Sequence, residues 1–145
     1  MTYNNEIEVF HDSCLGLSKV ELQLLELAYL KMASQSGRNF SDLEQVRIEA
    51  FDYKAHYNCS YDEACDALNK ASNMLFEREI HFSAQITNDN STVVVRSRWI
   101  GQFKYDKAFT YVELYFSPLI IRALQARMMG TTEQICEYSC IKIIN

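Results

Sequence analysis

Apolar side chains recur at helical spacing in two segments of the chain, each preceded by a capping box. Ser18 and Glu21 can satisfy each other's backbone N–H groups at the start of the first helix, and Ser60 and Glu63 can do the same for the second. The first helix is apolar around much of its circumference, which favours burial in the core over a leucine-rich dimer seam. The stripe of the second helix consists of Ala64, Leu68, Ala71 and Leu75.

Alternating apolar and polar positions predict strands between and after these helices. Residues 46–49 alternate as a short half-buried strand does, and residues 51–57 read as a short helix. Two β-rich runs, 79–87 and 92–103, meet at Asn88-Asp89-Asn90, whose residues tolerate the geometry of a hairpin turn. A third strand over 111–116 is expected to pair with the Trp99 strand.

The order of these elements predicts the fold class. Ser117 and Pro118 provide a cap and a first-turn proline, so a last helix is expected to run from there to about Met129. A helix-turn-helix, an antiparallel hairpin, a further strand and a helix make up an α+β winged helix, with the hairpin as the wing. This order makes DNA binding the first functional hypothesis.

The second strand of the hairpin carries a basic pair. Arg96 and Arg98 lie two residues apart, so both should project from one face of the strand together with Ile100. With Lys104 and Lys107 they form the densest basic group in the chain. They serve either as phosphate clamps or as solubilising charges on an exposed sheet, and the pattern alone leaves both open.

Charge limits the kind of DNA contact that is possible. The chain of 145 residues has a net charge of −5, with a net charge of −7 over residues 1–66 and +2 over residues 67–145. Because basic side chains supply most non-specific affinity for nucleic acid, indiscriminate binding is not expected. The exposed face of the second helix includes Asp62, Asp66 and Glu77, which phosphates repel. Any contact with DNA must therefore be local.

Composition excludes several other classes of protein. At 48% apolar residues the length suits one domain, and no apolar run approaches the roughly 20 residues that cross a bilayer. The N-terminus lacks the pattern of a signal peptide, so we expect a cytoplasmic protein. The three histidines and five cysteines show no metal-ligand spacing beyond Cys136 and Cys140, and the chain has no P-loop or G-x-S-x-G motif. We expect no metal, no cofactor and no enzymatic activity.

Three motifs in order resemble a known family. They are Asp66-Ala67-Leu68-x-x-Ala71-x-x-x-Leu75-Phe76-x-Arg78, then Ser97-Arg98-Trp99-Ile100, then Val112-Glu113-Leu114-x-Phe116-Ser117-Pro118. Together they resemble the first winged helix of the plasmid replication initiators that bind iterons, the Rep proteins, over roughly Leu15 to Met129. The helix that begins near Ser18 is also similar to the first helix of that family.

The resemblance implies an initiator that binds repeated double-stranded DNA at a plasmid origin and contacts host replication proteins. In that family a second winged helix reads bases, whereas the first forms the dimer interface and contacts mostly backbone. After Met129 this chain departs from the pattern. We therefore expect an N-terminal arm over 1–14, the winged helix over 15–129 and a tail over 130–145, with the family's second winged helix absent. The alternative is an interaction module that binds no DNA and modulates a full-length initiator.

Two sets of site residues follow from the hypothesis. The residues expected to contact phosphates are Lys70, Asn73, Arg78, Arg96, Arg98, Lys104 and Lys107. A homodimer is expected to form through the outer face of an aromatic-rich sheet, because a half-exposed sheet invites pairing with a second copy. The residues expected at that interface are Trp99, Phe103, Tyr111 and Tyr115.

Overall fold

The structure is a computed structural model that describes residues 14–34, 45–85 and 92–129. Its elements follow the order predicted from the sequence pattern. They are α2 (Lys19–Ser34), β1 (Gln45–Glu49), α3 (Ala50–Tyr57), α4 (Tyr61–Glu77), β2 (Glu79–Gln85), β3 (Thr92–Arg98), β4 (Ile100–Tyr105), β5 (Tyr111–Phe116) and α5 (Pro118–Met129). The predicted arm before residue 14, tail after 129 and turn at 88–90 lie outside the described residues.

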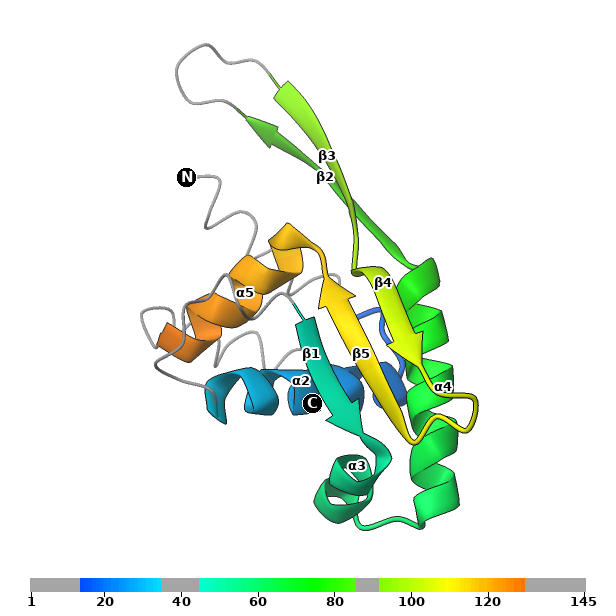
Figure 1. The fold of residues 1–145 in the computed structure, drawn as a ribbon. Coiled ribbons are helices and arrows are strands. Elements are labelled where there is room, and N and C mark those ends of the chain that lie inside the picture. Colours follow the sequence, from blue (N-terminus) through cyan, green and yellow to red (C-terminus); the bar gives the residue numbers. More distant parts are fainter. Residues whose placement is uncertain (1–13, 35–44, 86–91, 130–145) are drawn as a thin grey trace.

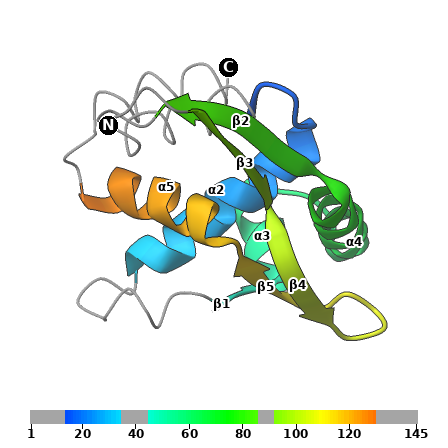
Figure 2. The same ribbon diagram turned by 90° about the horizontal axis from the view of Figure 1, so that it is seen from above.

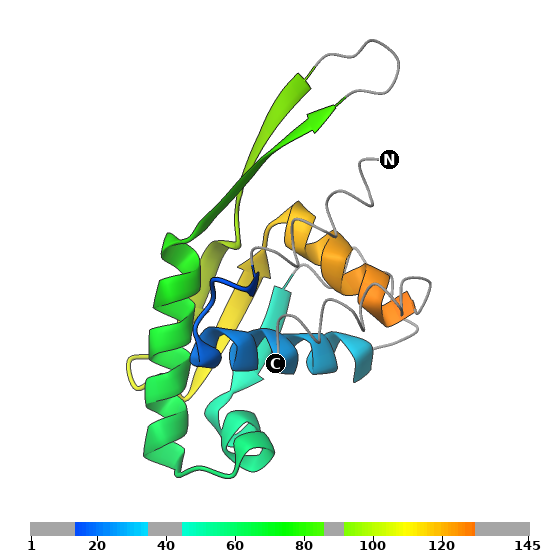
Figure 3. The ribbon, with the colours of Figure 1, turned by 180° about the vertical axis from the view of Figure 1, so that it is seen from behind.

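A three-stranded antiparallel sheet forms one layer of the body. β5 is central and pairs with β1 on one side and β4 on the other. Along β5, Val112, Leu114 and Phe116 are buried, while the residues between them are half-buried. The buried side faces α2 and α4, so the sheet lies in front of the helices in Figure 1 and behind them in Figure 3. None of the described helices covers the outer face.

The helices begin where the capping residues predict. At α2 the Ser18 N–H donates to the Glu21 carboxylate at 2.9 Å, and at α4 the Ser60 N–H donates to Glu63 at 2.8 Å. The return bonds from the N–H groups of Glu21 and Glu63 to the serine hydroxyls complete both capping boxes. α3 ends at Asn58, which takes the left-handed conformation that asparagine tolerates.

The apolar surface of α2 lies in the core rather than at a seam between copies. Leu24, Leu25, Leu27 and Met32 are all buried, together with Ala28. α5 adds Leu119, Ile120 and Leu124 to the same cluster, and Figure 2 shows it crossing over α2. The expected burial of the leucine-rich helix is confirmed.

The wing is a separate two-stranded sheet, and the expected single strand over 92–103 is wrong. β3 pairs with β2 in a hairpin that projects from the body (Figure 1), whereas β4 pairs with β5. The division falls at Trp99, whose side chain is 1% exposed and whose carbonyl accepts from Ser117 N–H at 3.1 Å. A shift of register between Ile100 and Gln102 also breaks the alternation, so Ile100 is buried instead of projecting with the arginines.

A buried ion pair joins the base of the wing to α2. The Glu21 side chain is fully buried and accepts from Arg78 Nε at 2.6 Å and from Arg78 Nη2 at 2.9 Å. Burial alone would raise the pKa of Glu21, but hydrogen bonds from Arg78 and Ser18 outweigh it and lower that pKa below its ordinary value. Arg78 is the residue between α4 and β2, so this pair fixes the point where the wing leaves the body.

Replacing Arg78 with methionine should leave the Glu21 carboxylate buried and unpaired. We expect the free energy of unfolding at neutral pH to fall by about 3 kcal/mol, the lower end for a broken buried pair because Arg78 is partly exposed. Denaturant unfolding at several pH values measures the change. The exposed Lys70→Met variant on the same helix is the matched control and should change stability by less than about 0.5 kcal/mol.

The pH dependence of this loss has a definite sign. In the variant the folded pKa of Glu21 rises above the ordinary 4.5, so the destabilisation shrinks as the pH falls through the raised pKa. In the parent chain that pKa is below 4.5, so the stabilisation is complete above 4.5 and is lost as the pH falls below it. A difference between the two proteins that stays constant with pH would contradict this assignment.

Candidate nucleic-acid and dimer interfaces

Arg96 and Arg98 project from the same face of β3, as the alternation predicts, and both are exposed. Each also has a contact within the chain. Arg96 donates to the Glu79 carboxylate from Nη2 at 2.8 Å and from Nε at 3.2 Å, whereas Arg98 Nη1 donates to the Phe76 carbonyl at 3.4 Å. The hydrogen bond from Arg96 lowers the pKa of Glu79, so this carboxylate is ionised at neutral pH. We call Arg96 and Arg98 the wing-base pair.

The predicted contacts on the second half of α4 lie close to the start of the wing. Asn73 and Arg78 line a shallow hollow of about 390 Å³ together with Met74 and Glu77. The Asn73 amide donates to the Asn69 carbonyl at 2.9 Å, which holds its side chain along the helix surface. Arg78 directs its guanidinium into the ion pair with Glu21, so its charge is already neutralised.

The structure separates the remaining predicted cations. Lys70 lies on α4 beside a groove between helices, and Lys104 lies on the outer face of the sheet. Lys107 is in the β4–β5 turn, at the end of β4 away from the wing (Figure 1). The seven residues expected to contact phosphates therefore do not form one surface.

The outer face of the sheet has a row of charges flanked by tyrosines. Arg47, Glu113 and Lys104 are cross-strand partners in the middle of the sheet. Arg47 Nη1 lies 3.4 Å from Glu113, and its guanidinium lies 3.8 Å from the centre of the Tyr111 ring. On the other side of the row the Tyr115 hydroxyl donates to the Gln45 side chain at 3.0 Å. This face combines flat aromatic area with paired charges.

Two aromatic residues that were expected on the outer face of the sheet do not lie there. Trp99 belongs to the core, as described above. Phe103 is the cross-strand partner of Leu114, which points inward, so Phe103 faces α4 and contacts Phe76 with ring centres 5.4 Å apart. Of the four predicted interface residues, the structure places Tyr111 and Tyr115 together on the outer face.

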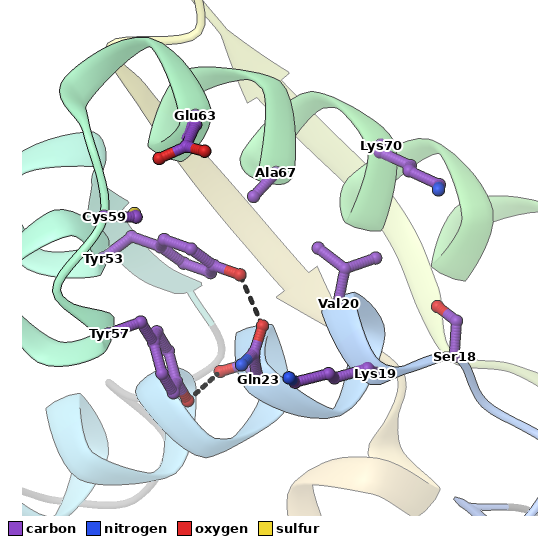
Figure 4. A pocket seen from close by; sticks show the side chains of 10 residues that line it. All are labelled: Ser18, Lys19, Val20, Gln23, Tyr53, Tyr57, Cys59, Glu63, Ala67 and Lys70. Carbon is purple, nitrogen blue, oxygen red and sulfur yellow. Dashed lines mark hydrogen bonds between the residues drawn. The ribbon is translucent and has the colours of Figure 1, made fainter.

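A groove of about 490 Å³ lies between α2, α3 and α4 (Figure 4). Its tyrosine hydroxyls are already used, because Tyr53 donates to the Gln23 side chain at 2.6 Å and Tyr57 donates to the Gln23 carbonyl at 3.0 Å. Burial raises the pKa of both phenols, so they are protonated at neutral pH and cannot act as bases. The two tyrosine hydroxyls of the groove are thus protonated and hydrogen-bonded within the domain.

Within the described residues, no group of three or more His, Cys, Asp or Glu side chains is arranged to hold a metal ion. Cys136 and Cys140 lie outside those residues. Cys14 is buried as a small core residue, and Cys59 and Cys65 are half-buried free thiols. Among the helices that the structure describes, none is long and apolar enough to span a membrane.

Comparison with known proteins identifies the family. The model of the family described as initiator replication protein, WH1, matches residues 1–132. The chain belongs to this family. The match confirms the resemblance to replication initiators, and it extends over the helices, the sheet and the wing described above. A search of the curated proteins gives no significant match.

A solved structure confirms the winged-helix fold of this WH1 domain. It is the crystal structure of the MSBI1.176 WH1 domain, a replication protein isolated from a multiple sclerosis patient. The two chains are 23% identical and superpose with a TM-score of 0.69, which covers 85% of this chain and 91% of the other. At this level of identity the likeness establishes the fold.

Sequence reasoning missed the two carboxylates that neutralise predicted DNA contacts. Glu21 was expected only as part of a capping box, and its partner Arg78 is 57 residues away in the chain. Glu79 had a usable signal, because the hairpin register places it directly opposite Arg98 and two pairs away from Arg96, on the same face of the hairpin. Pairing the charges across the predicted hairpin would have identified this contact.

Proposed function

We propose that this WH1 domain acts in plasmid replication initiation by dimerising and by contacting the backbone of origin repeat DNA with its wing. The observation that carries the DNA part is the projecting hairpin with the exposed wing-base pair on one face. Phosphate contacts position a protein on the duplex without reading its sequence, which suits a domain with an acidic second helix. Host replication proteins are proposed as further partners, and a cytoplasmic location is proposed with this function.

The dimer part of the proposal uses the outer face of the sheet. Tyr111 and Tyr115 offer aromatic area, and Arg47, Glu113 and Lys104 form a row whose charges alternate in sign. Packing two copies of this face about a two-fold axis would bring aromatic and charged residues of one copy against those of the other. Aromatic residues at such a centre contribute most of the binding energy.

A specific observation favours a second candidate function. Arg96 is held by Glu79 and Arg98 by a backbone carbonyl, so the wing-base pair is not preorganised for phosphate. A domain with this arrangement can serve as a dimerisation module that modulates a full-length initiator without binding DNA itself. A stable dimer that shows no affinity for duplex DNA would decide for this function.

Neutralising the wing-base pair tests the DNA contact. We expect Arg96→Gln with Arg98→Gln to weaken binding equally for repeat-containing and scrambled duplexes, and to reduce the slope of log affinity against log salt by about 2. Fluorescence anisotropy at several salt concentrations measures both quantities. The matched control, Lys54→Gln with Lys107→Gln, removes the same charge at exposed positions away from both the wing and the proposed dimer face. A larger loss in the control than in the arginine variant would overturn the wing contact.

Removing Glu79 should have the opposite effect. Glu79→Gln leaves Arg96 free to donate to a phosphate, so we expect the affinity for duplex DNA to rise roughly two- to fivefold at low salt. Glu63→Gln also removes one negative charge, at the start of α4 away from the wing, and glutamine can still close the capping box, so this variant serves as the control. Equal gains in the two variants would indicate an effect of net charge alone, and no gain in either would count against phosphate binding by Arg96.

The dimer contact is tested by polar substitution on the outer face. Tyr111→Ser with Tyr115→Ser should raise the dimer dissociation constant by at least about tenfold, because aromatic anchors dominate such interfaces. Light scattering and sedimentation over a range of concentrations measure the change. Phe51→Ser, at an exposed aromatic residue of α3, should leave the mass unchanged. Dimers of undiminished stability in the tyrosine variant would remove the sheet face from the proposal.

A further inference from the structure

A second exposed surface lies at the end of the body away from the wing. Three segments meet there: the start of α3, the start of α4 and the β4–β5 turn. The Ala50 N–H at the start of α3 donates to the Thr110 carbonyl of the turn at 2.8 Å. Asp106 of the same turn is close enough to Tyr61, the first residue of α4, to act on its phenol. Figures 1 and 3 both show the turn beside the lower half of α4.

Large aromatic side chains are unusually exposed on this surface. Phe51 is 66% exposed, Tyr105 is 50% exposed and Tyr61 is 41% exposed. The Tyr105 ring stacks on Phe109 with centres 4.3 Å apart and also on Phe103 with centres 5.4 Å apart, so neighbouring rings hold it in place. Asp106 accepts from the Thr110 N–H at 2.7 Å and from its hydroxyl, which holds the turn in place. Exposed aromatic groups held in this way are typical of protein contact sites.

Carboxylates surround these rings. Asp62 and Asp66 lie on the first turns of α4, and together with Asp106 they raise the pKa of the half-buried Cys65 thiol beyond the effect of burial. Glu49 also acts on the Tyr61 phenol from the end of β1. Some of the nearby charges are paired, because Arg47 Nε lies 3.7 Å from Glu49 and Lys31 pairs with Asp52. The other cations are Lys54, 5.9 Å from the centre of the Phe51 ring, and Lys107 in the turn, against the carboxylates of Asp62, Asp66 and Asp106. The surface therefore repels phosphates and attracts cationic groups.

We propose that this surface docks a basic segment of a partner protein, one that presents lysine or arginine beside apolar side chains. The docking surface is defined as Phe51, Tyr61 and Tyr105 with Asp62, Asp66 and Asp106. The aromatic rings bury the apolar side chains and the stems of the basic ones, while the carboxylates and ring faces receive the charged heads. Charge complementarity selects such a segment over nucleic acid.

The position of the docking surface gives it a role beyond the proposed DNA and dimer contacts. It lies at the opposite end of the body from the wing and away from the outer face of the sheet (Figure 1). A partner bound there would leave the wing-base pair, Tyr111 and Tyr115 uncovered. The domain can thus hold a protein at one end while the other end contacts DNA or a second copy.

Binding of synthetic peptides tests the proposal. The probes are a labelled peptide of lysine, arginine, leucine and phenylalanine, the same peptide with serine in place of the apolar residues, and a version with glutamate in place of the basic ones. We expect the first to bind at least about tenfold more tightly than the second, and the third not to bind. Amide chemical shifts measured by NMR should change in Phe51, in residues 61–66 and in residues 105–107.

Two double variants and a control test whether the aromatic rings and the carboxylates both contribute to peptide binding. Phe51→Ser with Tyr61→Ser should reduce affinity for the basic apolar peptide by at least about tenfold, and Asp62→Asn with Asp66→Asn should do the same without altering the aromatic residues. The control, Glu77→Gln, removes an exposed carboxylate at the other end of α4 and should bind as the parent does. Equal losses in the control, or shift changes centred on the α2–α3–α4 groove or the sheet face, would overturn the proposal.

Two further outcomes would also overturn the proposal. If the same residues shift when the protein alone is concentrated, a second copy occupies the surface and the proposed partner is wrong. If duplex DNA displaces the peptide from these residues, the surface binds nucleic acid and the proposal is again overturned. Because peptide binding is measured without DNA, its result is independent of whether the wing contacts a duplex.

Discussion

The carboxylate of Glu21, buried and held by Arg78 and Ser18, is the constraint on which the arrangement of this domain depends. It joins three elements at one point: the first turn of α2, the end of α4 and the start of the wing. A buried charge is costly without partners, so α4 must end where Arg78 can reach α2. Hydrogen bonds are directional and apolar contacts are not. The pair between Glu21 and Arg78 therefore defines one position for the wing relative to the body.

The wing needs such an anchor because it has no helix layer of its own. A two-stranded hairpin is only marginally stable in water, and its direction is set where it joins the body. Arg78 holds the β2 side of that junction, and Trp99 holds the β3 side with its buried indole. The Ser97 hydroxyl adds a hydrogen bond of 3.1 Å to the Ser117 hydroxyl at the start of α5. Any surface built on Arg96 and Arg98 is therefore oriented by the residues at the junction between the wing and the body.

Patterns of neighbouring residues in the sequence predicted most of the helices and strands. The candidate site depends on contacts between residues far apart in the chain, which such patterns do not reveal. The capping boxes at Ser18 and Ser60 fixed two helix starts, because their hydrogen bonds join residues three apart. The break at Trp99 was missed because alternation continues through it in the sequence and fails only when the indole enters the core. The basic residues looked like one group because they are close along the chain. The length of β4 then places Lys107 at the opposite end of the sheet from Arg98.

The fold places the excess of acidic side chains and the basic wing-base pair at different ends of the domain. Among the described elements of the acidic half, β1 and α3 each balance one acidic against one basic side chain, and the excess of carboxylates lies on the first turns of α4, at the end opposite the wing. Because α4 is the second helix of the helix-turn-helix, its acidic start opposes insertion of that end into a DNA groove. In the proposed DNA contact a duplex approaches the wing end, where the surface of α4 carries Asn69 and Asn73 as well as the exposed Glu77. In the two proposals above, the acidic start of α4 receives a cationic protein segment and the wing contacts a duplex, so the proposed partners bind at opposite ends of the domain.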